Sequence, residues 1–125
     1  MPASQKKQVL IIEDDPLLIK MYKTKLINEG FEVLTASDGQ EGLEMALKSA
    51  PQAIILDIMM PKLSGLDMLK QLRADSAGSK IPVIVISNLS QENEAEEARR
   101  LGAKEYLVKA NFTPKEVIEK VKQYL

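Results

Sequence analysis

The sequence predicts an α/β fold in which helices cover both faces of a five-stranded parallel sheet. Three observations support this prediction. Short runs rich in β-branched residues alternate along the whole chain with segments of helical periodicity. The connections between them are short, as in the right-handed β-α units that build parallel sheets. Several of the runs are also apolar at consecutive positions, which is typical of strands that are covered on both faces.

The expected strands are the five short runs, and the expected helices lie between and after them. In chain order the strands are residues 9–12, 31–36, 53–56, 83–86 and 106–108. The apolar faces of the five expected helices are Leu17, Leu18, Met21, Tyr22 and Leu26; Leu43, Ala46 and Leu47; Leu66, Leu69 and Leu72; Ala95, Ala98 and Leu101; and Val117, Ile118 and Val121. The fourth helix, expected over 91–101, has only a weak apolar stripe and many acidic residues. A solvated face explains this composition, and so would a movable helix that binds a partner.

Capping residues agree with this division. Asp15 and Thr113 each precede a proline, so we expect both to cap a helix, and Glu116 completes a possible capping box with Thr113. Gly30 and Gly102 lie where helices are expected to end in a left-handed residue.

Composition limits the chemistry and the partners. The 125 residues fit one domain, expected over 8–125 after a flexible tail at 1–7. With a net charge of −1 and interspersed charges, the chain is not expected to bind nucleic acid or anionic membranes directly. The first residues lack the apolar core of a signal peptide, so a cytoplasmic domain is expected. No cysteine or histidine is present, which excludes thiolate and imidazole chemistry.

Polar side chains gather at the carboxyl ends of the expected strands. Glu13 and Asp14 follow the first strand, Asp57 the third, Ser87 the fourth and Lys109 the fifth. Parallel α/β sheets bind ligands beyond this edge. Each residue alone is explained by a turn or a solvated surface, but clustered carboxylates repel one another unless a cation lies among them. Because only oxygen ligands are available, Mg²⁺ is the cofactor that we expect.

Four segments together resemble the receiver domain of response regulators in two-component signalling. They are "LIIEDDP", "LDIMMPKLSG", "VIVIS" and "GAKEYLVK", in the order and with the spacing of that family, and the resemblance covers 9–125. It implies a three-layer, flavodoxin-like sandwich with strand order 2-1-3-4-5. It also implies that Asp57 accepts a phosphoryl group. The metal ligands would then be Asp14, Asp57 and the backbone carbonyl of Met59, with Glu13 binding directly or through water.

The resemblance also assigns roles around the phosphoryl group. Ser87 would bond a phosphoryl oxygen, and the ammonium of Lys109 would pair with the group. Tyr106 would change rotamer when the site is occupied and thereby alter the surface of the fourth helix, fifth strand and fifth helix. A half-buried packing role for Tyr106 is the alternative. Pro61 and Gly65 are expected to shape the turn that directs the Met59 carbonyl inward.

The function that follows is that of a phosphoacceptor module, phosphorylated by a histidine kinase or a phosphotransfer protein and read by a downstream protein. It would catalyse only its own phosphorylation and dephosphorylation and is therefore not expected to be an enzyme in the ordinary sense. A monomer or a phosphorylation-dependent dimer is expected. One alternative is a pseudo-receiver that binds partners without phosphorylation. A second, the haloacid-dehalogenase type of phosphatase, requires an acid where this chain has Met59.

Two departures from the family pattern are visible. Asn88 stands where alanine is usual after the hydroxyl, and the chain reads Lys109-Ala110-Asn111-Phe112 where the pattern Lys-Pro-Phe with a cis bond is usual. Because a cis bond before a residue other than proline costs about 2.5–4 kcal/mol, we expect a trans Lys109-Ala110 bond. The extra residue would let Phe112 return to its place, and Lys109, expected on the strand, would still reach Asp57.

Overall fold

A computed structural model describes residues 6–60, 62–88 and 92–125. It contains a five-stranded sheet in the order β2-β1-β3-β4-β5, and all four neighbouring pairs are parallel. The strands are β1 (Gln8–Ile12), β2 (Glu32–Ala36), β3 (Ala53–Asp57), β4 (Val83–Ser87) and β5 (Glu105–Val108). The predicted fold class and strand order are confirmed.

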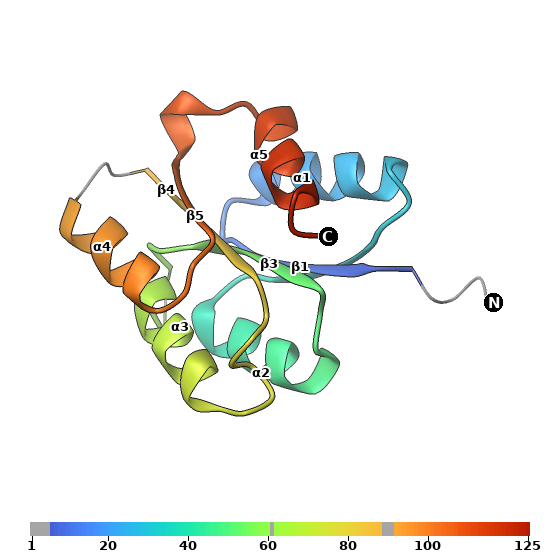
Figure 1. Ribbon diagram of the computed structural model, residues 1–125. Helices are drawn as coiled ribbons and strands as arrows, with labels where there is room; N and C mark the ends of the chain where they lie inside the picture. The colour runs from blue at the N-terminus through green and yellow to red at the C-terminus, as the bar shows by residue number, and fades with distance from the viewer. Residues whose placement is uncertain (1–5, 61, 89–91) are drawn as a thin grey trace.

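Five α-helices cover the two faces of this sheet (Figure 1). They are α1 (Pro16–Asn28), α2 (Gly39–Ser49), α3 (Gly65–Ala74), α4 (Glu92–Arg100) and α5 (Pro114–Lys122), with a 3-10 turn, η1 (Lys109–Asn111), before α5. Helices α1 and α5 lie on one face, and α2, α3 and α4 lie on the other. None of the helices in the described part of the chain is both long and apolar enough to span a bilayer.

The burial of the strands explains their apolar sequences. Every residue of β3 and β4 is buried, because these strands lie inside the sheet and helices cover both of their faces. Alternate strand residues therefore belong to two core clusters, one on each side of the sheet. The buried polar residues of β3 and β4, Asp57 and Ser87, lie at the carboxyl ends of these strands, where the site described below is found.

The predicted helix caps are present. Oδ1 of Asp15 accepts a hydrogen bond from the backbone N–H of Leu17 at 2.9 Å. Thr113 and Glu116 form the reciprocal capping box at the start of α5. Gly30 and Gly102 have φ angles of +92° and +82°, in the left-handed region that favours glycine.

Two expectations about single residues are wrong. Leu17 was predicted on the buried face of α1 but is 63% exposed. The buried residues of α1 are Tyr22 and Leu26, and Leu17 lies outside the helix face that these two residues define. Lys109 begins the turn η1 instead of ending β5, because the pairing of β5 with β4 stops at Val108. Pro61 and the expected first residue of the fourth helix, Gln91, lie outside the described residues.

The peptide bond after Lys109 has the expected geometry. No cis peptide bond occurs in the described part of the chain, so Lys109-Ala110 is trans. The turn η1 accommodates the additional residue, and Phe112 packs against the cluster between the sheet and α1 and α5. Asn88, the other departure, is exposed at the end of β4.

Candidate phosphoacceptor and metal site

Three carboxylates meet at the carboxyl edge of the sheet. Asp57 ends β3, and Glu13 directly follows β1, which pairs with β3 in a register that places Ile12 beside Leu56. Glu13, Asp14 and Asp57 each offer a carboxylate oxygen within 4.8 Å of the others. The sequence predicted this meeting of strand ends.

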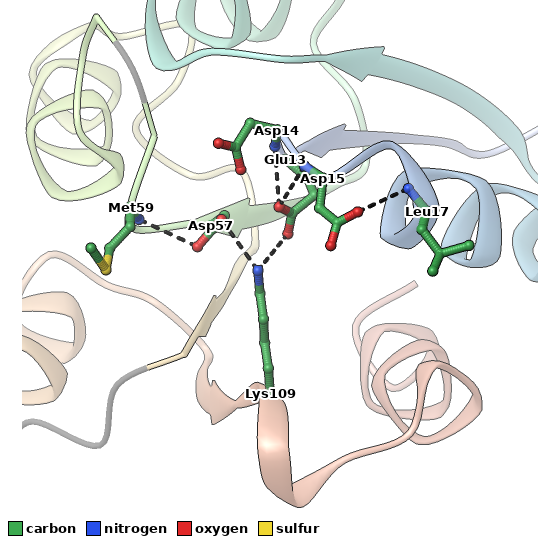
Figure 2. Close-up of polar contacts among 7 residues, drawn as sticks. All are labelled: Glu13, Asp14, Asp15, Leu17, Asp57, Met59 and Lys109. Carbon is green, nitrogen blue, oxygen red and sulfur yellow. Dashed lines mark hydrogen bonds and ion pairs between the residues drawn. The ribbon is translucent and has the colours of Figure 1, made fainter.

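The three carboxylates differ in burial and in their hydrogen bonds. Glu13 and Asp57 are buried, whereas Asp14 is exposed. Oε2 of Glu13 accepts hydrogen bonds of 3.1 Å from the backbone N–H groups of both Asp14 and Asp15 (Figure 2). Glu13 thus organises its own loop, while Asp15 faces away from it to cap α1.

Lys109 reaches into this cluster from the side opposite to Asp14 (Figure 2). Its ammonium lies 2.9 Å from Oε1 of Glu13 and 3.3 Å from Oδ2 of Asp57. The predicted contact with Asp57 is therefore present, and the contact with Glu13 was not predicted. Among the described residues, one ammonium pairs with two of the three carboxylates, so the cluster is short of positive charge.

The environment of the cluster changes the pKa values of Glu13 and Lys109. Burial raises the pKa of Glu13 to about 7, and the nearby charge of Asp57 adds to this effect, although the contact with Lys109 opposes it. Burial disfavours the charged form of Lys109, but its contacts with Glu13 and Asp57 outweigh burial and raise the pKa of the ammonium. Lys109 is therefore a permanent cation, whereas Glu13 requires additional positive charge to stay ionised near neutral pH.

The donor set fits a hard divalent cation. Oε1 of Glu13 is buried and, among the described residues, accepts no hydrogen bond of good geometry, although Lys109 is its ion-pair partner. An exposed carboxylate beside two buried ones leaves a solvent-facing side for bound water, as Mg²⁺ requires. The backbone N–H of Met59 donates to Oδ1 of Asp57 at 3.3 Å. That the Met59 carbonyl binds the metal stays a prediction.

Gly65 holds the strand end against α3. Its N–H donates to the carbonyl of Ile58 at 2.8 Å, and a Cβ atom at Gly65 would lie 2.4 Å from the carbonyl oxygen of Asp57. Glycine is therefore needed for close approach of two backbones. The sequence indicated a turn residue here, and the structure gives it this more specific role.

Ser87 and Tyr106 occupy the expected places on adjacent strands. Ser87 is fully buried at the end of β4. Tyr106, on β5, pairs in register with Val85 of β4. The Tyr106 ring is half-buried and packs against the cluster on the α4 side of the sheet. Their roles in phosphoryl binding and switching stay predictions.

A pocket of about 460 Å³ adjoins the acidic cluster and includes a residue that the sequence did not indicate. Asp14, Met59 and Ser64 line it, together with Glu94 of α4. Oε1 of Glu94 is buried and has no hydrogen-bond partner in the described part of the chain. Because α4 contains several acidic residues, the sequence did not distinguish Glu94, which faces the pocket, from the others. The pocket places α4 directly beside the site.

Comparison with known proteins identifies the family. The sequence model of the response regulator receiver domain matches residues 9–122. The chain is 34% identical over 121 residues to the probable transcriptional regulator ycf27 of Porphyridium aerugineum, covering 97% of this chain and 49% of that protein. It is 33% identical over 119 residues to the polar-differentiation response regulator DivK of Brucella anthropi, covering 95% of this chain and 96% of DivK. The chain thus spans about half the length of the first relatives and nearly all of DivK.

Solved structures agree with this relationship. The chemotaxis response regulator CheY4 of Vibrio cholerae has a TM-score of 0.87 and 29% sequence identity to this chain, with 97% of this chain and 100% of CheY4 covered. The shared architecture includes the strand order described above. The chain therefore belongs to the receiver domain family of response regulators.

Proposed function

We propose that this receiver domain accepts a phosphoryl group on Asp57 and signals the modification through an altered protein surface. One observation carries the proposal: the Asp57 carboxylate ends a buried strand, with Glu13 and Asp14 beside it and the Lys109 ammonium 3.3 Å from its Oδ2. A carboxylate that is fixed in this way is positioned to act as a nucleophile toward an anionic group.

The reaction is phosphoryl transfer from a phosphohistidine. A carboxylate oxygen of Asp57 attacks phosphorus, an O–P bond forms, and the P–N bond breaks as the imidazole leaves with the bonding electron pair. The attacked group is already anionic, so fixed positive charge is needed at the site. Lys109 supplies one such charge, and the buried hydroxyl of Ser87 is the proposed partner of a phosphoryl oxygen.

Glu13, Asp14, Asp57 and the Met59 carbonyl are the proposed ligands of Mg²⁺. When bound, the ion neutralises negative charge on the carboxylates and on the phosphoryl oxygens. The protein contributes the fixed position of these ligands: Glu13 is held by two backbone N–H groups, and Asp57 by the N–H of Met59. These hydrogen bonds limit the reorganisation required when the site is charged.

The proposed output surface is formed by α4, β5 and α5. Its switch is Tyr106, which lies on the strand next to that of Ser87 and packs on the α4 side of the sheet. A hydroxyl drawn toward a phosphoryl group would free space beside it for the ring. The upstream partner would be a histidine kinase or phosphotransfer protein in the cytoplasm, and a downstream protein would bind the altered surface of a monomer or phosphorylation-dependent dimer.

Incubation with acetyl phosphate and Mg²⁺ tests the proposal. Intact-mass spectrometry of the wild type is expected to detect one added phosphoryl group, which Asp57→Asn abolishes. Asp67→Asn is the matched control, because Asp67 is an exposed carboxylate in the first turn of α3 and is expected to leave modification unchanged.

The pseudo-receiver alternative predicts a different result. If the wild type forms no adduct with acetyl phosphate, and no beryllofluoride complex is seen by fluorine NMR at saturating Mg²⁺, then Asp57 is not a phosphoacceptor. Modification that persists in Asp57→Asn would instead place the acceptor elsewhere.

A further inference from the structure

Four cationic side chains surround a second pocket, at the opposite edge of the sheet from Asp57. The pocket has a volume of about 480 Å³, and its cations are Arg73 of α3, Lys80 before β4, Arg100 of α4 and Lys104 before β5. No acidic residue is among the described residues that line it. We call it the basic pocket. It lies at the amino ends of β4 and β5, whereas the phosphoacceptor site lies at the carboxyl ends.

Arg73 forms the fixed wall of the basic pocket. Its guanidinium donates hydrogen bonds to backbone carbonyls of two segments, Gly78, Ser79 and Ile81 before β4, and Leu101 and Gly102 after α4. All of these acceptors are neutral, and no carboxylate in the described part of the chain forms an ion pair with Arg73. Burial lowers the pKa of Arg73, as expected of a desolvated cation without an acidic partner.

Of the three remaining cations, only Arg100 has an acidic partner among the described residues. Lys80 and Lys104 are exposed and form no ion pair with any described residue. Arg100 pairs with Glu97 at 3.2 Å, but the same carboxylate also lies 3.8 Å from Lys70. The pocket is thus a local excess of positive charge in a chain whose net charge is −1. An anion that enters it gains the attraction of several cations together.

We propose that the basic pocket binds a multivalent oxyanion of the phosphate class. A concave site favours a compact ligand, and cations on several walls favour a ligand with charge on several oxygens. Lys80, Arg100 and Lys104 would contact the oxygens, while Arg73, whose Nε and Nη1 groups already donate to backbone carbonyls, would supply charge from the wall. Inorganic pyrophosphate and a nucleoside diphosphate share this chemistry. The proposal does not depend on phosphorylation of Asp57.

Titration of the ¹⁵N-labelled protein by NMR without Mg²⁺, at constant ionic strength, tests the proposal. Pyrophosphate is expected to shift the amide signals of Ser79, Leu101 and Gly102 and to bind more tightly than phosphate. Tighter binding of a nucleoside diphosphate would indicate a nucleotide, and equal binding an inorganic ligand. Shifts spread over the whole surface, or shifts confined to the Asp57 loop, would overturn the proposal.

Matched double variants separate this site from a general charge effect. Lys80→Ser with Lys104→Ser is expected to weaken pyrophosphate binding about tenfold, equivalent to about 1.4 kcal/mol. Lys23→Ser with Lys48→Ser removes the same charge from exposed positions on α1 and α2 and is expected to have little effect. Equal loss in both variants would contradict a specific site. So would an acidic peptide or nucleic acid that binds while pyrophosphate does not.

Discussion

The ammonium of Lys109 lies 2.9 Å from Oε1 of Glu13, closer than its 3.3 Å distance to Asp57. Lys109 therefore has two carboxylate partners. A phosphoryl group on Asp57 would offer Lys109 new oxygens, and a cation bound to Glu13 would replace the positive charge that Lys109 provides there. Under the proposed function, this pairing would link metal binding to the availability of Lys109 for the phosphoryl group.

The first prediction concerns pH. The pKa of Glu13 is raised from 4.5 to about 7 in the folded protein, so between these values the folded state binds more protons than the unfolded state. The free energy of unfolding contributed by Glu13 must therefore fall as pH rises through this window. Without Mg²⁺, we expect the wild type to lose stability with rising pH relative to Glu13→Gln, as measured by urea unfolding.

The glutamine variant is a suitable reference, because its amide oxygen can still accept from the N–H groups of Asp14 and Asp15. Saturating Mg²⁺ should reduce the difference in pH dependence between the two proteins, since a bound cation favours ionised Glu13. Parallel stability curves for wild type and variant without metal would show that Glu13 does not titrate in this range.

The features of the site that the sequence could predict were those that depend on strand order. Parallel strands end at the same edge, so Glu13, Asp57 and Ser87 had to lie close together once the strands were recognised. Asp15 and Thr113 were predictable because their caps involve residues next to them in the chain. These inferences required no knowledge of side-chain packing.

Other features depend on contacts that no local pattern reveals. The distance of Lys109 to Glu13 depends on how η1 leaves β5, and the need for Gly65 depends on how closely α3 approaches β3. Leu17 was placed on the wrong face because the apolar residues of α1 extend around more of the helix than its buried face requires. Arg73 gave no signal, since its acceptors are backbone carbonyls.

The second prediction separates the acidic residues of the first loop. Asp14 belongs to the cluster of carboxylates, whereas Asp15 caps α1. We expect Asp14→Ala to weaken Mg²⁺ binding strongly. We expect Asp15→Ala to retain Mg²⁺ affinity and to lower stability by about 1 kcal/mol. Metal titration followed by intrinsic fluorescence or NMR measures the affinity, and urea unfolding measures the stability.

Stabilisation by the metal gives a second measure of the same difference. Mg²⁺ at about 100 times its dissociation constant should add about 2.7 kcal/mol to the stability of any variant that still binds it. The wild type and Asp15→Ala should show this increase, and Asp14→Ala should not at the same concentration. Equal loss of affinity in the two variants would show that the metal ligands are wrongly chosen.

The third prediction concerns Gly65. A Cβ atom there would lie 2.4 Å from the carbonyl oxygen of Asp57, so Gly65→Ala must displace α3 or the end of β3. We expect a loss of about 1–3 kcal/mol in stability and slower modification of Asp57 by acetyl phosphate. Gly30→Ala is the control, because its φ of +92° makes alanine strained but no atom lies near the new Cβ.

The two glycine variants should therefore differ in one respect only. Both are expected to be less stable than the wild type: Gly65→Ala because its Cβ would clash with the backbone of Asp57, and Gly30→Ala because left-handed backbone costs a residue with a Cβ about 1–2 kcal/mol. Only Gly65→Ala should modify Asp57 more slowly when both proteins are fully folded. Normal modification in folded Gly65→Ala would mean that the close approach serves stability alone.

The last prediction concerns Leu17, an exposed apolar residue next to the acidic loop. Leu17 is 63% exposed in the first turn of α1, and with Met21 it lines a shallow pocket on the outer side of that helix. Its N–H is bonded to Asp15, so it lies beside the acidic loop. A phosphodonor that brings its histidine to Asp57 must approach this edge, where Leu17 offers apolar surface for burial. We expect Leu17→Ala to slow phosphotransfer from a partner protein about fivefold, equivalent to about 1 kcal/mol.

Ile27 provides the comparison, because it is 51% exposed near the other end of the same helix. Ile27→Ala should leave phosphotransfer unchanged, and neither variant should alter the rate with acetyl phosphate, which makes no contact with α1. Stopped-flow or gel-based transfer from a phosphorylated donor protein measures the first rate, and intact-mass spectrometry measures the second. If Leu17→Ala slows both reactions equally, Leu17 supports the acidic loop and the donor does not contact it. If both variants transfer at the wild-type rate, the donor approaches Asp57 without using the exposed face of α1.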